Sequence, residues 1–428
     1  MKFSFGSHKV SSSFSAFPAA LWAIALLLGA CESNSSSSKF KIGTLLPVTG
    51  DLAQYGGSMQ DSARLLVETV NQCGGVLGQP VELIAEDDQT EPAAGASAMT
   101  KLAELDRVGA VVGAASSAVS SAAVDIAVRN RVVLISPSST SPVFTERSRK
   151  GDFQGFWFRT APPDTFQGKA LAQLAQAQGF KTVAVLAVNN DYGNGLTNSF
   201  IPAFEALGGT VVNKDKIIRY PPDSSVFTSE VQAVFRQKPD AVLLIAYPET
   251  GSLILKTAYQ QGFLGKGIAV ITTDGMKEPK LADMVGKNSK GEYIAAGIIG
   301  TAPSAGGPAL SEVQKRYAAK YQRQPKIYDP NTWDAAALLV LAAEAAQATS
   351  GDAIKEKIQD VANPPGEEVT DVCKALSLIR DGKPVNYQGA SGSVDLNEFG
   401  DVTGRYDIWT IEPKGTLKTV GSISISSE

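Results

Sequence analysis

The stretch that decides the fold is residues 182–188, Thr-Val-Ala-Val-Leu-Ala-Val, taken together with residues 241–246, Ala-Val-Leu-Leu-Ile-Ala. Both runs are almost continuously apolar, which is typical of strands that a sheet buries on both faces. Helix-like stretches lie between them at residues 194–207 and 227–236. Strands separated by helices of this length indicate right-handed βαβ units, and therefore a parallel sheet.

The same alternation extends through much of the chain. Strands are expected at residues 42–48, 81–86, 110–114, 132–136, 182–188, 210–217, 241–246 and 267–272. Helices are expected between them at residues 58–72, 93–105, 117–128, 165–178, 194–207, 227–236 and 251–261. Gly74-Gly75 and Gly208-Gly209 stand where the glycines that end helices belong.

The pattern turns mainly helical after residue 308. Helices are expected at residues 310–321, 332–348, 353–361 and 368–380, and strands return at residues 406–411 and 419–425. We therefore predict an α/β fold in which two doubly wound, mainly parallel sheets form two lobes. Lobe 1 takes residues 39–160 and 299–400, and lobe 2 takes residues 161–298 and 401–428. Ligands of such sheets bind outside the carboxyl ends of the strands, so we expect a site in the cleft between the lobes.

Composition limits the class of protein. A chain of 428 residues exceeds one compact core, so two or more lobes are expected. The net charge of −4 becomes −6 without residues 1–30, which hold Lys2 and Lys9 and no carboxylate. A protein of this charge lacks the positive surface that binds nucleic acid, so no nucleic-acid partner is expected.

The one histidine, His8, lies in that same N-terminal segment, so the mature chain would have none. Nucleophiles activated by imidazole and metal sites with histidine ligands are therefore excluded. Cys31, Cys73 and Cys373 are too scattered for a zinc finger or an iron–sulfur site. A serine with a lysine or carboxylate base remains open, but we find no signature for it. We expect a protein that is not an enzyme and uses no metal and no cofactor.

The first 38 residues have the pattern of an export signal. Lys2 and Lys9 precede an apolar run at residues 19–30, which is shorter than the about 20 residues that a membrane-spanning helix needs. The run ends in Leu28-Gly29-Ala30-Cys31, which resembles the lipobox of bacterial lipoproteins. The alternative is a buried core helix.

We predict a signal peptide at residues 1–30, a lipid on Cys31 and a flexible Ser-rich tether at residues 31–38. The protein would be exported to the periplasmic or cell-surface face and held to a membrane by this N-terminal lipid.

Five segments, in order, carry a resemblance to a known family. They are residues 42–50 (Ile-Gly-Thr-Leu-Leu-Pro-Val-Thr-Gly), 71–78 (Asn-Gln-Cys-Gly-Gly-Val-Leu-Gly), 86–88 (Glu-Asp-Asp), 135–140 (Ile-Ser-Pro-Ser-Ser-Thr) and 387–392 (Tyr-Gln-Gly-Ala-Ser-Gly). The chain resembles the type I periplasmic solute-binding proteins of ABC importers, in their leucine/isoleucine/valine-binding branch. The resemblance runs through nearly the whole mature chain, and it implies two lobes, joined by three crossings, that close around a ligand.

The resemblance implies a site for a ligand carboxylate. Ser117 opens an expected helix after the strand at residues 110–114, and it matches the family's carboxylate-binding serine. Free N–H groups at a helix N-terminus suit such an anion. Thr140 matches the family's second hydroxyl, and Ser138 would offer its backbone. The alternatives are that Ser116 or Ser117 only caps its own helix and that residues 138–141 are an ordinary polar loop.

A buried ammonium group needs a carboxylate partner, because an unpaired buried charge costs several kcal/mol. Asp274 and Glu249 both follow expected strands of lobe 2. The resemblance places Asp274 on the family's amino-group acid, shortened from glutamate. The alternatives are that Asp274-Gly275 is a turn and that Glu249 belongs to the first turn of a helix.

Three tyrosines, Tyr55, Tyr192 and Tyr328, match aromatic positions that line the cleft in the family. Together they would supply rigid rings with polar tips, although each alone is also compatible with surface packing. Ala115 and Ser116 stand where the family's leucine binder has a bulkier apolar residue and a cysteine. A smaller wall leaves room for a different or larger ligand side chain.

In the family's leucine binder, the cysteine at the position of Ser116 pairs with a second cysteine. This chain has Thr90 at that second position, so that disulfide is absent. Cys73 and Cys373 would both lie on lobe 1, and an exported compartment permits them to pair. Free buried thiols are the alternative, because sequence does not give their separation.

The resemblance implies a monomeric, lipid-anchored protein that captures an amino acid and delivers it to the membrane permease of an ABC importer. One rival is a sensor that binds an amide or an aromatic acid in the same cleft. A second is a lipoprotein that activates a cell-wall synthase without transport, and an enzyme is the third.

Overall fold

The computed structural model describes residues 1, 6–7, 39–265 and 267–425. The predicted apolar run at residues 19–30, Cys31 and the Ser-rich tether lie outside the described residues. From Lys39 onward the chain forms one compact unit. Among the described helices, none combines the length and the apolar character needed to cross a bilayer.

The first sheet has five parallel strands in the order β2-β1-β3-β4-β5. The strands are β1 (Lys41–Leu46), β2 (Glu82–Asp87), β3 (Ala110–Gly113), β4 (Val133–Ser136) and β5 (Trp157–Arg159). Residues of β3 and β4 are buried throughout, as their apolar sequences predict. The first sheet therefore has the parallel, doubly wound form expected from the sequence.

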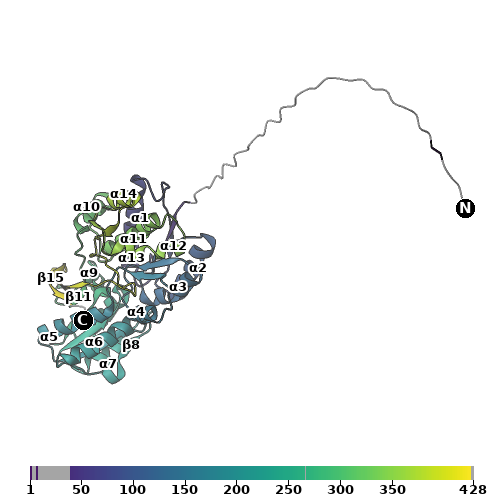
Figure 1. Ribbon diagram of the computed structural model, residues 1–428. Coiled ribbons are helices and arrows are strands. Elements are labelled where there is room, and N and C mark those ends of the chain that lie inside the picture. Colours follow the sequence, from purple (N-terminus) through teal and green to yellow (C-terminus); the bar gives the residue numbers. More distant parts are fainter. Residues whose placement is uncertain (2–5, 8–38, 266, 426–428) are drawn as a thin grey trace. The chain divides into compact units, whose positions relative to one another are not determined.

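Helices cover both faces of this sheet (Figure 1). One core lies beneath α2 (Pro92–Thr100), α3 (Ser117–Arg129) and α4 (Val143–Arg149). The other core is built by α1 (Ala53–Gln72) and by helices that return from later in the chain, namely α10 (Leu310–Tyr321), α11 (Asp329–Ala346), α12 (Gly351–Lys355), α13 (Ile358–Ala362) and α14 (Val372–Arg380). Helix α11 is buried from Asp329 to Glu344, because it lies at the centre of that layer.

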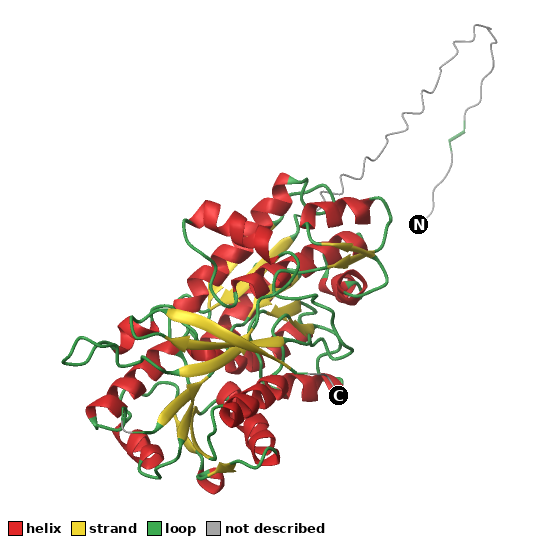
Figure 2. Cartoon of the chain, turned by 90° about the vertical axis from the view of Figure 1, so that its left-hand side faces the viewer, coloured by secondary structure: helices red, strands yellow, loops and turns green. Residues whose placement is uncertain are grey.

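The second sheet has the order β15-β14-β11-β10-β9-β6-β7, and β8 pairs with β6 beyond this path. Its strands are β6 (Thr182–Val188), β7 (Thr210–Val211), β8 (Ile218–Tyr220), β9 (Ala241–Ile245), β10 (Ala269–Thr272), β11 (Ile299–Pro303), β14 (Arg405–Ile411) and β15 (Leu417–Ser424). Only β14 and β15 are antiparallel to their neighbours. Figure 2 shows the strands as twisted sheets between helices.

The helices of the second lobe are α5 (Asp164–Ala177), α6 (Asp191–Ala206), α7 (Thr228–Phe235), α8 (Pro248–Gln260) and α9 (Leu281–Val285). Three segments connect the two sheets, at residues 160–163, 304–309 and 400–404. Strand β11 pairs with β10, so residues 299–303 lie in the second sheet, whereas the sequence analysis assigned them to lobe 1. The bilobal α/β fold itself is confirmed.

The predicted single strand at residues 210–217 is wrong. The chain forms β7, a 3₁₀ turn at Lys214–Lys216 and then β8. The cause is Asn213, whose side chain accepts from Val185 N at 2.9 Å and donates to Val185 O at 2.8 Å. These two bonds replace the backbone pairing that a continuous strand would make, so the strand is interrupted at Asn213.

Two predicted helices also begin or divide differently. Residues 353–361 form parts of α12 and α13, and residues 368–369 belong to β12 (Glu367–Val369), which pairs with β13 (Val385–Tyr387). Helix α14 begins only after Asp371, whose carboxylate accepts from Lys374 N at 2.8 Å as an N-cap. Capping by Asp371 therefore decides where this helix starts.

Cys73 and Cys373 form a disulfide, which resolves the alternative that the sequence left open. Their Cα atoms are 5.8 Å apart, and the bond joins the end of α1 to α14 across 300 residues of sequence. Both cysteines pack against the core of lobe 1. The bridge therefore ties the first helix of this lobe to the helices that return to it.

Replacing both cysteines with serine should lower the free energy of unfolding by about 2–5 kcal/mol, because the unfolded chain loses a cross-link. Ligand affinity should not change, because the bridge lies away from the cleft. Thermal unfolding of the double variant and the wild type checks this. An unchanged midpoint, or a wild-type protein that reacts with two equivalents of a thiol reagent, would contradict it.

Candidate ligand-binding site

A small cavity lies between the two lobes, at the carboxyl ends of their strands. It is lined by Leu52, Tyr55, Met59, Ala115, Ser117, Ser138, Tyr192, Tyr247, Asp274, Gly275 and Tyr328. The centre of a water molecule has about 20 Å³ in which to move there, close to what one water needs. The lobes are therefore closed, and a ligand as large as an amino acid reaches these residues only when they separate.

Six of the eight predicted ligand residues line this one cavity: Tyr55, Ser117, Ser138, Tyr192, Asp274 and Tyr328. The other two, Thr140 and Glu249, do not line it. The structure thus brings together residues that are as far apart in sequence as Tyr55 and Tyr328. Their role in binding a ligand stays a prediction.

Asp274 is the carboxylate of the cavity. It begins a 3₁₀ turn directly after β10 and is 3% exposed. Tyr192 donates a hydrogen bond to its Oδ1 at 2.8 Å, and Tyr328 donates to its Oδ2 at 2.5 Å. Burial raises the pKa of Asp274, although the hydrogen bonds from Tyr328 and Tyr192 oppose this. The turn predicted as the alternative is therefore present, and it presents the carboxylate to the cleft.

Four tyrosine rings enclose the carboxylate. The rings of Tyr192 and Tyr247 stack at a centroid distance of 5.5 Å, and those of Tyr55 and Tyr328 meet edge to face at 6.3 Å. The Tyr55 hydroxyl donates to the carbonyl of Gly275 at 3.2 Å, which joins lobe 1 to lobe 2. Surface packing, the alternative for these tyrosines, is excluded, because each is at most 5% exposed.

The opposite wall is the N-terminus of α3. Ser116 is the N-cap residue in an extended conformation, and its side chain makes no capping hydrogen bond. Ser117 is 2% exposed, and its Oγ accepts from the backbone N of Ser141 at 3.3 Å. The first turn of α3 thus keeps backbone N–H groups without a side-chain cap, and these groups suit an anion.

The loop from Ser138 to Ser141 lies beside α3. Ser138 lines the cavity, and its hydroxyl donates to the carbonyl of Ala115 at 3.1 Å. Thr140 is fully buried outside the cavity lining, and its hydroxyl lies beside the carboxylate of Asp164. The loop is therefore not an ordinary solvent-exposed polar turn.

Glu249 lies at the start of α8, outside the cavity lining. It is partly buried, and its carboxylate accepts from Gln54 Nε2 at 3.0 Å across the cleft. Its position fits the first-turn alternative given by the sequence, with an added contact between the lobes.

Sequence reasoning missed two polar residues of this region, as well as the apolar Leu52 and Met59 of the lining. Asp164, at the start of α5, is fully buried, and a hydrogen bond from the Thr140 hydroxyl opposes the rise of its pKa. Burial and then the charge of Asp274 raise its pKa, so the two acids are near each other. The second missed residue is Tyr247, which directly follows β9. The rule that ligands bind where strands end could have found Tyr247, whereas nothing in the sequence distinguishes Asp164 from a helix-start acid.

Comparisons with known proteins agree with this fold. The family described as receptor family ligand binding region matches residues 58–414. The chain is 27% identical to the chemotactic signal transduction system substrate-binding protein BasB of Halobacterium salinarum, over 83% of each chain. It is 31% identical to the Leu/Ile/Val-binding protein BraC3 of Rhizobium johnstonii, over 55% of this chain and 61% of that protein.

A solved structure, the leucine binding protein LivK of Thermotoga maritima, superposes with a TM-score of 0.74 at 26% identity, covering 90% of this chain and 98% of that one. The chain therefore belongs to the receptor ligand-binding family, as a type I periplasmic binding protein of the branched-chain amino acid binding branch.

Proposed function

We propose that this protein captures an amino acid, with an aliphatic or related side chain, and delivers it to the permease of an ABC importer. The observation that carries the proposal is the arrangement of opposite charges across one closed cavity. The buried carboxylate of Asp274 lies on lobe 2, and the N-terminus of α3 with Ser117 lies on lobe 1. A zwitterion complements both walls at once.

The ammonium end of the ligand fits the two buried acids. Asp274 has two tyrosine donors, and a carboxylate has room for further donors. Asp164 is fully buried, and the Thr140 hydroxyl alone does not fill what its two oxygens can accept. Burying an acceptor without a donor costs free energy, so an ammonium group that donates to Asp274, with Asp164 behind it, relieves that cost.

The side chain of the ligand would lie among apolar and aromatic groups. Leu52 and Met59 line the cavity together with the tyrosine rings, and Ala115 leaves part of the wall small. Branched aliphatic side chains gain most from such a surface, because burial of apolar area stabilises the complex.

A second cavity of about 450 Å³ shares Tyr247 with the first and carries negative charge. Asp51, Glu91, Asp191 and Asp223 line it, and no lysine or arginine does. Burial raises the pKa of Asp51 to about 6, so it is still mainly ionised at neutral pH. Such a field attracts an ammonium group and repels a ligand that is only an acid.

Binding would work by closure of the lobes. The contacts that join the lobes in the closed form include Tyr55 to Gly275, Gln54 to Glu249, Ser121 to Asp191 and Tyr328 to Asp274. A ligand that bridges both walls binds the closed form more tightly than the open form and shifts the population towards it. The closed form would then dock on the permease. No chemistry on the ligand is part of this proposal, and the protein would not be an enzyme.

The lipid anchor is part of the same proposal. Cleavage before Cys31 and acylation of its sulfur would hold the binding protein on the periplasmic or cell-surface face, near its permease. The Ser-rich tether would let a monomer reach the permease while it remains anchored.

A sensor is the second candidate function, because BasB is a substrate-binding protein of a chemotactic signalling system. It would use the same ammonium site and a different partner. An aromatic acid is disfavoured as the ligand, because it has no ammonium group that could pair with Asp274. Activation of a cell-wall synthase would need no ligand in the cavity at all.

Aliphatic amino acids should stabilise the soluble body, residues 39–428, against thermal unfolding. At 100 times the dissociation constant, a ligand adds about 2.7 kcal/mol, which raises the midpoint by a few degrees. A panel of amino acids, amides and aromatic acids checks this. A shift with aromatic acids alone would contradict the proposal, and no shift in a ligand-free, folded sample would favour the synthase activator.

Asp274→Ala should weaken amino-acid binding by about 100-fold or more, because an unpaired buried ammonium costs about 3 kcal/mol or more. Glu249→Gln is the matched control, because this acid follows a neighbouring strand but lies outside the cavity lining. Isothermal titration calorimetry on both variants gives the affinities. If Glu249→Gln has the larger effect, the ammonium site lies at Glu249 instead.

Affinity for an amino acid should fall as the pH decreases. Burial raises the pKa of Asp274. On acidification, this group of the ligand-free protein therefore takes up a proton at a higher pH than an ordinary carboxyl group does. The neutral acid does not pair with an ammonium, so binding must release a proton and the affinity falls by up to about tenfold per pH unit below that pKa. Titrations from pH 8 downward test this, and the Asp274→Asn variant should show a flatter dependence. A wild-type affinity that rises on acidification would contradict the assignment.

A further inference from the structure

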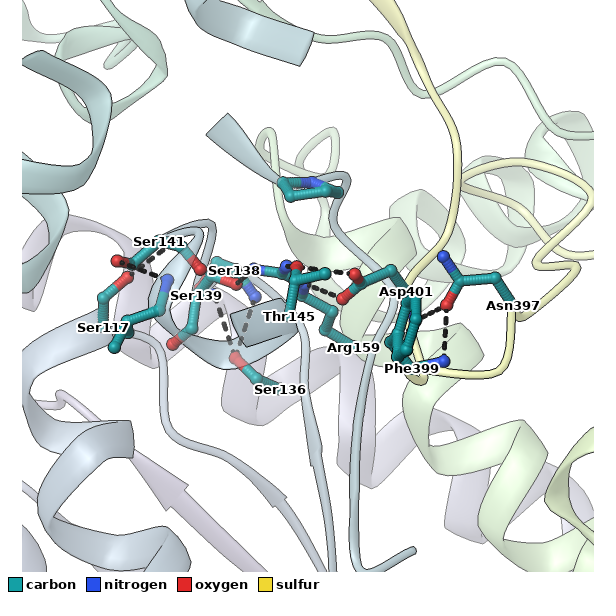
Figure 3. Close-up of polar contacts among 12 residues, drawn as sticks. Ser117, Ser136, Ser138, Ser139, Ser141, Thr145, Arg159, Asn397, Phe399 and Asp401 are labelled. Carbon is teal, nitrogen blue, oxygen red and sulfur yellow. Dashed lines mark hydrogen bonds and ion pairs between the residues drawn. The ribbon is translucent and has the colours of Figure 1, made fainter. Parts of the chain in front are cut away.

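Arg159 is a fully buried arginine at the end of β5, where the first crossing between the lobes begins. Its Nη1 donates to the carbonyl of Ser139 at 3.1 Å and to the carbonyl of Ser141 at 2.9 Å. These two carbonyls flank Thr140. The guanidinium group therefore holds the backbone of the loop of Ser138 to Ser141 at Ser139 and at Ser141 (Figure 3).

The other side of the guanidinium group contacts the third crossing. Arg159 Nε donates to Asp401 Oδ1 at 2.6 Å, and the Asp401 side chain is 3% exposed. Thr145 closes a triangle, because its hydroxyl accepts from Arg159 Nη2 at 2.8 Å and donates to Asp401 Oδ2 at 2.7 Å. The backbone N of Arg159 also donates to the carbonyl of Gly400 at 2.9 Å.

Asp401 is itself fixed. Its backbone N donates to Asn397 Oδ1 at 3.0 Å, and the same oxygen accepts from Phe399 N at 2.9 Å. Figure 3 shows the resulting series of contacts from Asn397 and Asp401, through Arg159, to Ser139, Ser141 and Ser117. One desolvated ion pair thus connects a hinge segment to the wall of the cavity.

The loop has a second attachment, at α3. The backbone N of Ser141 donates to Ser117 Oγ at 3.3 Å. Hydrogen bonds from the hydroxyls of Ser138 and Ser139 to the carbonyls of Ala115 and Ala114 also hold the loop. Loss of Arg159 would therefore release the two carbonyls on either side of Thr140 and leave these other attachments in place. The planar guanidinium group with its fixed donors can hold two carbonyls and a carboxylate together, whereas the single ammonium of a lysine cannot reproduce that geometry.

We propose that Arg159, held by Asp401, is a positioning residue for the ligand carboxylate: it fixes the loop of Ser138 to Ser141 against the hinge. This inference rests on the proposed binding of an amino acid. The rival explanation is that the pair only stabilises lobe 1, as a buried ion pair elsewhere would.

Arg380 provides a control in the same lobe, although its side chain is 34% exposed whereas that of Arg159 is fully buried. It donates to Glu344 Oε1 at 3.2 Å, to the carbonyl of Cys73 at 3.2 Å and to the carbonyl of Gly75 at 2.6 Å. Like Arg159, it joins a carboxylate to two backbone carbonyls, but it takes no part in the cavity. Glu344 is 3% exposed, so its carboxylate is as buried as that of Asp401.

The experiment compares Arg159→Lys with Arg380→Lys at a temperature where circular dichroism shows both to be folded. Calorimetry with the amino acid that stabilises the wild type gives the dissociation constants. We expect an increase of about tenfold or more for Arg159→Lys, equivalent to about 1.4 kcal/mol or more, and no change for Arg380→Lys. Hydrogen exchange of the amide of Ser141 should quicken only in Arg159→Lys.

If both variants bind as tightly as the wild type, the inference is wrong and the proposed function stands. If the wild type itself binds no amino acid, the proposed function fails, and the exchange rate at Ser141 alone decides whether Arg159 positions the loop. Equal exchange in both variants would overturn the inference. If Arg159→Lys does not fold, Thr145→Val replaces it, because this variant removes one member of the triangle. We again expect weaker binding of the amino acid and faster hydrogen exchange at Ser141.

Discussion

The carboxylate of Asp274 is buried in the closed cleft, where it accepts hydrogen bonds from tyrosines of both lobes. Tyr192 reaches it from α6 of lobe 2, and Tyr328 reaches it from the N-cap of α11 in lobe 1. Separation of the lobes would expose the carboxylate to water, and closure replaces part of that water with the hydroxyl group of Tyr328. The stability of the closed form therefore depends on the hydrogen bonds that the carboxylate of Asp274 accepts.

The two lobes supply opposite halves of the site. Lobe 1 contributes the hydroxyls of Ser117 and Ser138 and the N-terminus of α3, whereas lobe 2 contributes Asp274. Neither half alone complements a zwitterion, so a ligand of that kind gains most of its free energy only when both are present. This is the differential affinity that a closing mechanism needs.

Rigidity of lobe 1 supports the same mechanism. The disulfide between Cys73 and Cys373 joins α1 to α14, and Arg159 with Asp401 joins β5 to the third crossing. The disulfide stabilises the interior of lobe 1 and the ion pair ties the first crossing to the third, so in the proposed closure lobe 1 would move as a rigid body. A hinge of a few segment-terminal residues absorbs such motion without repacking a core.

The sequence by itself determined the layered α/β fold, because a strand buried on both faces must be apolar and a covering helix must repeat at its own period. The strand at Thr182–Val188 and the helix at Leu310–Tyr321 were predicted to the residue. The resemblance placed six residues that line the cavity. The tertiary structure alone decided the break at Asn213, the pairing of Cys73 with Cys373, and the burial of Asp164 and Arg159. Each of these depends on groups that are distant in sequence, and periodicity records only the local chain, so no pattern along the sequence could reveal them.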